Sequence, residues 1–277
     1  ALRRDLGVRV HKEYRGVSEG VLRVRALEQA ARSAEQMMKS TQMSLTAGSR
    51  TQLDVLNAQQ QFTLALRDLA LKYDLFLFAD EVYRDFCYEG KEHISILTLD
   101  GLEQNAIVID SVSKKYSACG ARIGTLISRN KEVMSTALKF AQARLSPPTF
   151  EQIGAEAAIE VPSAYFEEVS TEYVSRRDLL VSRLNAMPGV TCPNPGGAFY
   201  AMAKLPIDDA DKFCQWLLED FAFENQTVML APATGFYGTP GLGKQEVRLA
   251  YVLNLEDINK SMDCLEAALK VYPGLVK

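Results

Sequence analysis

The chain has 277 residues, of which 47% are hydrophobic, and its formal net charge is −4 at pH 7. A chain of this length and hydrophobic content can form a substantial core in one to three domains. Its negative net charge gives no reason to expect a nucleic-acid partner. Five cysteines without C-x-x-C spacing and only two histidines make a zinc site, a disulfide framework or another metal site unexpected. No signal peptide or membrane-spanning stretch is visible, so we expect a cytoplasmic protein that does not insert into a membrane.

The first 70 residues have the composition of long helices. They contain more Lys and Arg than Asp and Glu, and neither proline nor cysteine. Apolar residues at three- and four-residue spacing from Leu27 to Leu45 predict one helix, which Gly48 can end. Thr51 and Asp54 can cap a second helix that continues to Leu69. We therefore predict an α-helical hairpin over residues 1–70.

Two buried strands are predicted next in the chain. Leu75–Ala79 is a short apolar run that leads into Asp80, and Ala106–Asp110 is a second one that leads into Ser111. Open α/β sheets bind ligands at the carboxyl ends of such strands. Glu81 and Arg84, which follow the first strand, are expected to form an ordinary solvated pair.

The run Ser111–Gly124 carries the residues best suited to covalent chemistry. Its sequence is S-V-S-K-K-Y-S-A-C-G-A-R-I-G. The amine of Lys114, flanked by small hydroxyl residues, can form a Schiff base with an aldehyde. Ser111 and Arg122 can hold a phosphate group through neutral and charge-assisted hydrogen bonds. This combination suits a phosphorylated aldehyde cofactor.

Alternating helices and strands are predicted for the rest of the chain, which implies an α/β layer followed by an α+β lid. The predicted helices cover residues 131–145, 149–160, 164–187, 210–223 and 256–271, and the predicted strands fall within 190–205, 228–231 and 246–251. Gly238–Lys244 has the glycine spacing of a P-loop, but Gln245 stands where a Ser or Thr is needed, so a surface turn is expected. Arg248 is a single arginine in an apolar strand, where burial without an anion would be costly.

The S-x-S-K and G-x-R-x-G motifs resemble the pyridoxal-phosphate lysine region of class I/II aminotransferases, the aspartate-aminotransferase-like family of fold type I. By this resemblance, residues 71–277 correspond to the C-terminal three-fifths or so of such an enzyme. It implies that Lys114, rather than Lys115, carries the cofactor and that Arg248 grips the substrate α-carboxylate. The implied cofactor-binding residues are Asp80, Tyr83, Ser111, Ser113, Lys114 and Arg122. The loop Gly196–Tyr200, with Gly197 as a substrate-binding residue, either lines the substrate side or packs as a plain hairpin.

A second resemblance concerns residues 8–70. The stretch Ala47–Gln59, A-G-S-R-T-Q-L-D-V-L-N-A-Q, is similar to the helical hairpin tip of TolC-like outer-membrane efflux proteins. Residues 49–60 stand where aminotransferases carry an Asn-Pro segment that binds the cofactor. The two resemblances meet near Leu66–Tyr73 without a Gly-, Pro- or Ser-rich linker, which indicates a chimera.

The sequence therefore predicts three domains: an efflux-like hairpin over 1–70, a partial cofactor-binding domain over 71–175 and a small C-terminal domain over 176–277. The aminotransferase resemblance implies pyridoxal 5'-phosphate as cofactor, an amino acid such as aspartate and a 2-oxo acid as substrates, and a homodimer. We expect weak or no turnover, because the N-terminal half of the catalytic fold is replaced. The alternative function is a helical component of an efflux assembly without catalysis.

Overall fold

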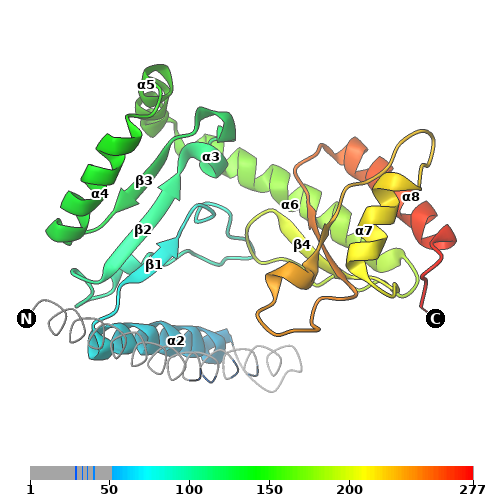
Figure 1. Cartoon of the computed structure of the whole chain (residues 1–277), viewed down its shortest axis with the longest axis horizontal. Helices are drawn as coiled ribbons and strands as arrows, with labels where there is room; N and C mark the ends of the chain where they lie inside the picture. The colour runs from blue at the N-terminus through cyan, green and yellow to red at the C-terminus, as the bar shows by residue number, and fades with distance from the viewer. Residues whose placement is uncertain (1–28, 30–32, 34–35, 37–39, 41–51, 277) are drawn as a thin grey trace, which may run out of the picture. The chain divides into compact units, whose positions relative to one another are not determined.

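In a computed structural model of the chain, residues 52–276 are described together with Gln29, Ser33, Gln36 and Ser40, which are helical (Figure 1). The rest of the predicted first helix and residues 47–51 of the predicted hairpin tip lie outside the described residues. The chain divides into two compact units. The first comprises residues 1–81, 94–111 and 124–147, and the second comprises residues 82–93, 112–123 and 148–277.

The first unit contains a three-stranded sheet. Its elements are α2 (Gln52–Tyr73), β1 (Leu77–Asp80), η1 (Ile96–Thr98), β2 (Ala106–Ser111), β3 (Gly124–Ile127) and α4 (Lys131–Arg144). The strand order is β1-β2-β3, in which β1 and β2 are parallel and β3 is antiparallel to β2. Because Asp80 pairs with Ile109 at the end of the parallel register, the carboxyl ends of β1 and β2 lie at one edge of the sheet.

Buried polar groups fix the loops around this sheet. Glu81 is only 4% exposed, and its Oε1 accepts hydrogen bonds from Ser95 Oγ and from the backbone N–H of Ile96, both at 3.0 Å. The expectation of a solvated Glu81 is therefore wrong, because the carboxylate satisfies N–H and O–H donors at the start of η1. Asn130 caps α4 in the same manner, since its Oδ1 accepts from the backbone N–H of Glu132 and Val133 at 3.0 and 3.1 Å.

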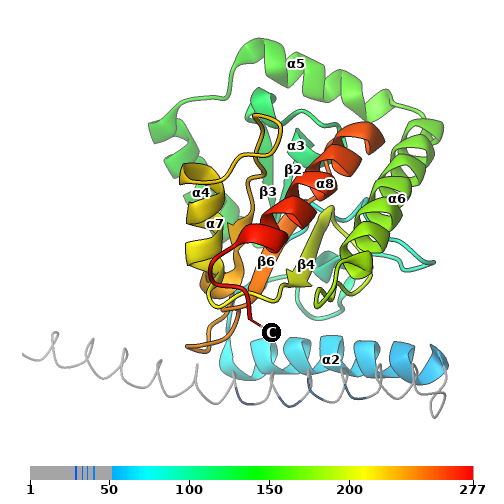
Figure 2. The ribbon, with the colours of Figure 1, turned by 90° about the vertical axis from the view of Figure 1, so that its right-hand side faces the viewer.

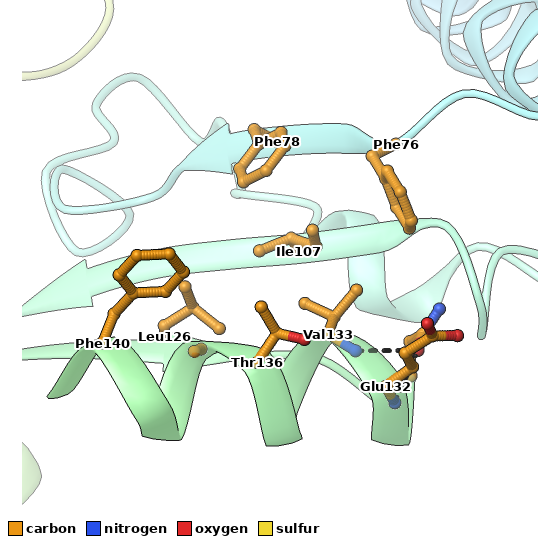
Figure 3. A pocket seen from close by; sticks show the side chains of 10 residues that line it. Phe76, Phe78, Ile107, Leu126, Glu132, Val133, Thr136 and Phe140 are labelled. Atoms are coloured by element: carbon orange, nitrogen blue, oxygen red, sulfur yellow. Dashed lines mark hydrogen bonds between the residues drawn. The ribbon is translucent and has the colours of Figure 1, made fainter. Parts of the chain in front are cut away.

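One face of the first unit's sheet is apolar and open to solvent. Phe76 and Phe78 alternate with Leu77 along the chain and so share one face, onto which α4 contributes Phe140 (Figure 3). Phe78 is 62% exposed and Phe140 is 73% exposed around a groove of about 390 Å³. The groove contains none of the residues to which the sequence assigns chemistry, so the candidate functional site lies elsewhere.

The second unit has its own core around a second sheet. Its elements are α3 (Val112–Lys115), η2 (Cys119–Ala121), α5 (Thr149–Ala157), η3 (Ala158–Glu160), α6 (Ser163–Ala186), β4 (Tyr200–Lys204), α7 (Ala210–Glu219), β5 (Ala231–Pro232), η4 (Ala233–Phe236), β6 (Glu246–Ala250) and α8 (Leu255–Val271). The strands pair antiparallel in the order β4-β6-β5. Helices α6, α7 and α8 lie over one face of β4 and β6 (Figure 2).

Alternation along β4 and β6 separates a core face from a half-buried face. Ala201 and Ala203 of β4 and Val247 and Leu249 of β6 are buried in the core that includes residues of α6, α7 and α8. The intervening residues of both strands are directed to the opposite face of the sheet. Arg248 is one of them, and it is half-buried.

Most predicted helices and strands are confirmed, and α2 runs without a break through the predicted join at 66–73. One strand, β3, was not predicted, and Lys114 lies in the single helical turn α3 that follows β2. All four residues of β3 are exposed, so the strand lacks the alternation of buried and exposed positions by which a half-buried strand is recognised. Within the residues that the structure describes, every helix is too short or too polar to span a membrane. The predicted domain boundaries at 70 and 175 stay a prediction.

Ionisable groups in the second core predict a stability that declines at alkaline pH. Burial raises the pKa of Cys192 and of Cys214 to about 11 each, and that of Tyr251 to about 12. Because these folded-state values exceed the unfolded ones, their contribution is fully present below about pH 9 and is lost between pH 9 and 12. We expect the Tm to be level up to pH 9 and to fall above it. Cys192→Ala should reduce the fall between pH 9 and 11, and a Tm that stays level to pH 11.5 would contradict this account.

Candidate functional site

In the first unit, the predicted residues Asp80 and Ser111 end the two parallel strands β1 and β2. Their position confirms that both lie at the carboxyl edge of the sheet, where this class of sheet binds ligands. The backbone N–H of Ser111 donates to the carboxylate of Asp110 at 2.8 Å, which fixes the end of β2. Asp80 is exposed and Ser111 is half-buried.

In the second unit, Lys114 lies in an aromatic environment. Its Nζ is 6.0 Å from the ring centre of Tyr83 and 5.7 Å from that of Phe199. Among the described residues, this amine has no hydrogen bond and no ion pair. The next lysine differs, because Lys115 Nζ lies 3.3 Å from a carboxylate oxygen of Asp85 and 4.7 Å from the ring centre of Phe166. Of the two lysines, Lys114 has the amine that is available for chemistry.

The segment that follows Lys114 presents a second cation. Arg122 follows η2 with a left-handed backbone (φ 55°) and is exposed. Its Nη1 donates to the carbonyl of Cys119 at 3.1 Å, and no acidic partner lies against it in the described part of the chain. The remaining guanidinium N–H groups can therefore bind an anion such as a phosphate. Ser113, in α3 beside Lys114, is half-buried.

Arg248 lies between two aromatic rings. Its guanidinium carbon is 4.5 Å from the ring centres of both Tyr200 and Phe236. Stacking holds the plane of the guanidinium while it leaves the N–H groups at its edge free to donate. No carboxylate pairs with Arg248 within the described residues. The arrangement suits two-pronged binding of a carboxylate ligand.

Tyr83 and Tyr200 connect the surroundings of Lys114 with those of Arg248. The hydroxyl of Tyr83 donates to that of Tyr200 at 3.1 Å, and the two rings pack edge to face at 5.8 Å. The second unit thus brings Tyr83 close to Lys114 and connects it to Arg248 through Tyr200, the first residue of β4. The sequence placed Tyr200 only in a loop that either lines the substrate side or packs as a hairpin, and it gave Phe236 no role. The contacts of both residues depend on strand register and on η4.

The loop before β4 is fixed by its backbone. Gly196 and Ala198 form backbone hydrogen bonds with the segment that follows Tyr83: Tyr88 N–H donates to Gly196 O at 3.1 Å, and Ala198 N–H donates to Phe86 O at 2.8 Å. Ala198 has a positive φ of 56°. Its carbonyl accepts hydrogen bonds from the hydroxyls of Tyr88 and Tyr251, at 2.6 and 3.0 Å, which stabilise this conformation. These contacts show that the loop packs tightly, while a substrate contact of Gly197 stays a prediction.

Gly197→Ala is expected to destabilise the second unit. A Cβ at this position would lie 2.9 Å from the backbone oxygen of Phe86, which cannot move without breaking the pairing of the two segments. Overpacking of this kind costs roughly 1–3 kcal/mol of unfolding free energy. The measurement is urea denaturation, with Gly235→Ala as control because a Cβ there meets nothing within 4 Å. Equal stability of the two variants would show that the close approach is unimportant.

Two further sequence predictions can be compared with the structure. Gly238–Lys244 lies in turns between η4 and β6 and not between a strand and a helix. The predicted turn is therefore confirmed, and the segment does not have the structure of a P-loop. Among the described residues, no three His, Cys, Asp or Glu side chains gather in a way that could hold a metal ion.

Comparison with known proteins places this chain in a family. The family model described as aminotransferase class I and II matches residues 54–251. Aspartate aminotransferase of Bacillus subtilis is 32% identical over 208 residues, which cover 72% of this chain and 50% of the relative. Aromatic-amino-acid aminotransferase 2 of Thermococcus litoralis is 30% identical, over 74% of this chain and 51% of the relative. The chain thus spans about half the length of these curated relatives.

Solved structures give the same result for the fold. The aromatic aminotransferase from Pyrococcus horikoshii matches with a TM-score of 0.66 and 29% identity, over 76% of this chain and 55% of that one. Aspartate aminotransferase from Thermotoga maritima matches with a TM-score of 0.64 and 30% identity, over 76% and 52%. The α/β fold of fold type I aminotransferases is therefore confirmed for this part of the chain. These comparisons give no support to the efflux-like hairpin or the chimera, and the family match begins at residue 54, inside the segment 8–70.

Proposed function

Because the chain belongs to the class I and II aminotransferases, a family that depends on pyridoxal 5'-phosphate, we propose that it takes part in amino-group transfer between an amino acid and a 2-oxo acid. The observation that carries the proposal is the amine of Lys114, which lies beside Tyr83 and has no ion-pair partner among the described residues. Within the described part of the chain, neither Arg122 nor Arg248 has a carboxylate partner, so their guanidiniums fit the phosphate of the cofactor and the carboxylate of a substrate.

Pyridoxal phosphate, when bound, supplies an electron sink for the charge that develops at the substrate α-carbon. In the proposal, Lys114 would hold the cofactor and then move the proton at that carbon. Asp80 would keep the pyridine nitrogen protonated, and Tyr83 would donate a hydrogen bond to the phenolic oxygen. Ser111, Ser113 and Arg122 would bind the phosphate. The substrate residues are Arg248, for the α-carboxylate, and Gly197.

The substrate class follows from the charge at Arg248 and from the relatives. Aspartate or an aromatic amino acid is proposed, because the relatives are named as aspartate and aromatic aminotransferases. We also propose that the protein forms a homodimer, is cytoplasmic and turns over weakly. The proposed domain boundaries are at residues 70 and 175. The efflux alternative is not proposed, because nothing in the comparisons favours it.

The proposal is tested on the full chain mixed with pyridoxal phosphate. We expect a new visible absorbance band and, with aspartate and 2-oxoglutarate present, slow formation of glutamate measured by chromatography. A band without glutamate would support cofactor binding and contradict turnover. No band at millimolar cofactor would contradict the proposed function as a whole.

A further inference from the structure

Tyr200 contacts two residues to which the proposed function gives different tasks. Its hydroxyl accepts a hydrogen bond from Tyr83 at 3.1 Å, and its ring lies 4.5 Å from the guanidinium carbon of Arg248. Building on the proposed function, we propose that Tyr200 is a positioning residue: its hydroxyl orients Tyr83 on the cofactor side, and its ring orients Arg248 on the substrate side.

The strand register makes the contact with Arg248 a built feature of the sheet. Tyr200 of β4 pairs with Ala250 of β6, and Arg248 pairs with Met202, so Tyr200 and Arg248 are diagonal neighbours on one face. The residues between them, Ala201 and Leu249, are buried on the other face. A shift of one residue would expose that core, so the register is strongly fixed. The backbone therefore holds the ring of Tyr200 under the guanidinium.

The second ring on Arg248 comes from a different element. Phe236 lies at the end of η4, and its ring centre is also 4.5 Å from the guanidinium carbon. Phe236 is 52% exposed and lies in a short helical turn. Tyr200 is half-buried and lies on β4, where it pairs with Ala250 of the central strand β6. Tyr200 thus provides the fixed side of the stack, and its loss should affect the orientation of Arg248 most.

The hydroxyl of Tyr200 acts on a separate partner. A phenol hydroxyl has one donor and can also accept, and its proton rotates to suit its neighbours. When Tyr83 donates to a ligand, Tyr200 can reverse the bond and donate to Tyr83, which keeps the Tyr83 oxygen in place. The edge-to-face contacts of Tyr83 with Phe199 and Tyr200, at 5.2 and 5.8 Å, hold the ring in the matching orientation.

Two substitutions separate these tasks. Tyr200→Phe removes only the hydroxyl, and Tyr200→Leu removes both the hydroxyl and the aromatic platform. The matched control is Tyr272→Phe, which removes a phenol hydrogen bond to Asp208 elsewhere in the second unit. All variants are first checked for a native Tm.

Both measurements use the cofactor-free full chain, so they remain informative if the proposed cofactor site fails. The first follows the ¹³Cζ resonance of Tyr83 in tyrosine-labelled protein, assigned with Tyr83→Phe. The second measures binding of succinate, a plain dicarboxylate, by calorimetry. We expect both Tyr200 variants to move the Tyr83 resonance by more than any other tyrosine resonance. Only Tyr200→Leu should weaken succinate binding, by roughly 3–10-fold as one cation–π contact is lost.

The outcomes decide between positioning and general packing. Tyr272→Phe should change neither quantity. An unchanged Tyr83 resonance in Tyr200→Phe would overturn the role of the hydroxyl. Equal succinate affinities for Tyr200→Phe and Tyr200→Leu, or no measurable binding to the unmodified chain, would overturn the role of the ring.

Discussion

Replacing Lys114 with alanine is expected to abolish the covalent attachment of pyridoxal phosphate. The amine of Lys114 lies near Tyr83 and Phe199 and has no ion pair with any residue that the structure describes, whereas Lys115 is held by Asp85 at 3.3 Å. Schiff-base formation needs an uncommitted primary amine, which alanine lacks. The visible absorbance of the mixture should fall to the sum of the absorbances of the free cofactor and the protein measured separately.

The matched control is Lys115→Arg. Arginine retains the positive charge beside Asp85 and Phe166, yet it cannot form a Schiff base. This variant should retain the absorbance band of the unmodified chain. Loss of the band in Lys115→Arg together with its persistence in Lys114→Ala would show that Lys115, and not Lys114, reacts with the cofactor.

Replacing Arg248 with leucine is expected to weaken carboxylate binding by roughly a hundredfold or more, because two charge-assisted hydrogen bonds are lost at about 1.5–3 kcal/mol each. The stack between Tyr200 and Phe236 fixes Arg248 but leaves its N–H groups available. Succinate binding measured by calorimetry gives the affinity.

Arg176 provides a control for this substitution. It also stacks on a tyrosine, 5.2 Å from the ring centre of Tyr173, but its Nε donates to Glu172 at 2.7 Å. Because that ion pair satisfies Arg176, Arg176→Leu should leave succinate affinity within about twofold of the original. Similar losses in both variants would mean that overall charge, and not the Arg248 stack, governs binding.

The sequence predicted those parts of the fold that carry strong local signals. The apolar strand before Ser111 and the helix over residues 131–145 were both predicted and are confirmed, because the pattern of apolar residues is a local property. The exposed four-residue strand β3 has no such signal and was missed. The burial of Glu81 was not predicted, because it depends on hydrogen bonds to η1, which begins 15 residues farther along the chain.

The candidate site was predictable in its individual residues and not in their contacts. The motif around Lys114 identified the amine, and isolation in an apolar strand identified Arg248. The contacts of Arg248 with Tyr200 and Phe236 depend on the pairing of β4 with β6 and on the position of η4. These elements bring together residues that are far apart in the sequence. The same holds for Ala198, whose carbonyl is held by Tyr88 and Tyr251 from far along the chain in both directions. Register and tertiary contacts of this kind leave no local pattern in the sequence.

The most direct test of the account is to locate the lysine that reacts with pyridoxal phosphate. The full chain is incubated with the cofactor, reduced with borohydride, digested and mapped by mass spectrometry. We expect one predominant pyridoxyl-modified peptide, with the modification on Lys114. Modification spread over several lysines, or concentrated on Lys115, would contradict it.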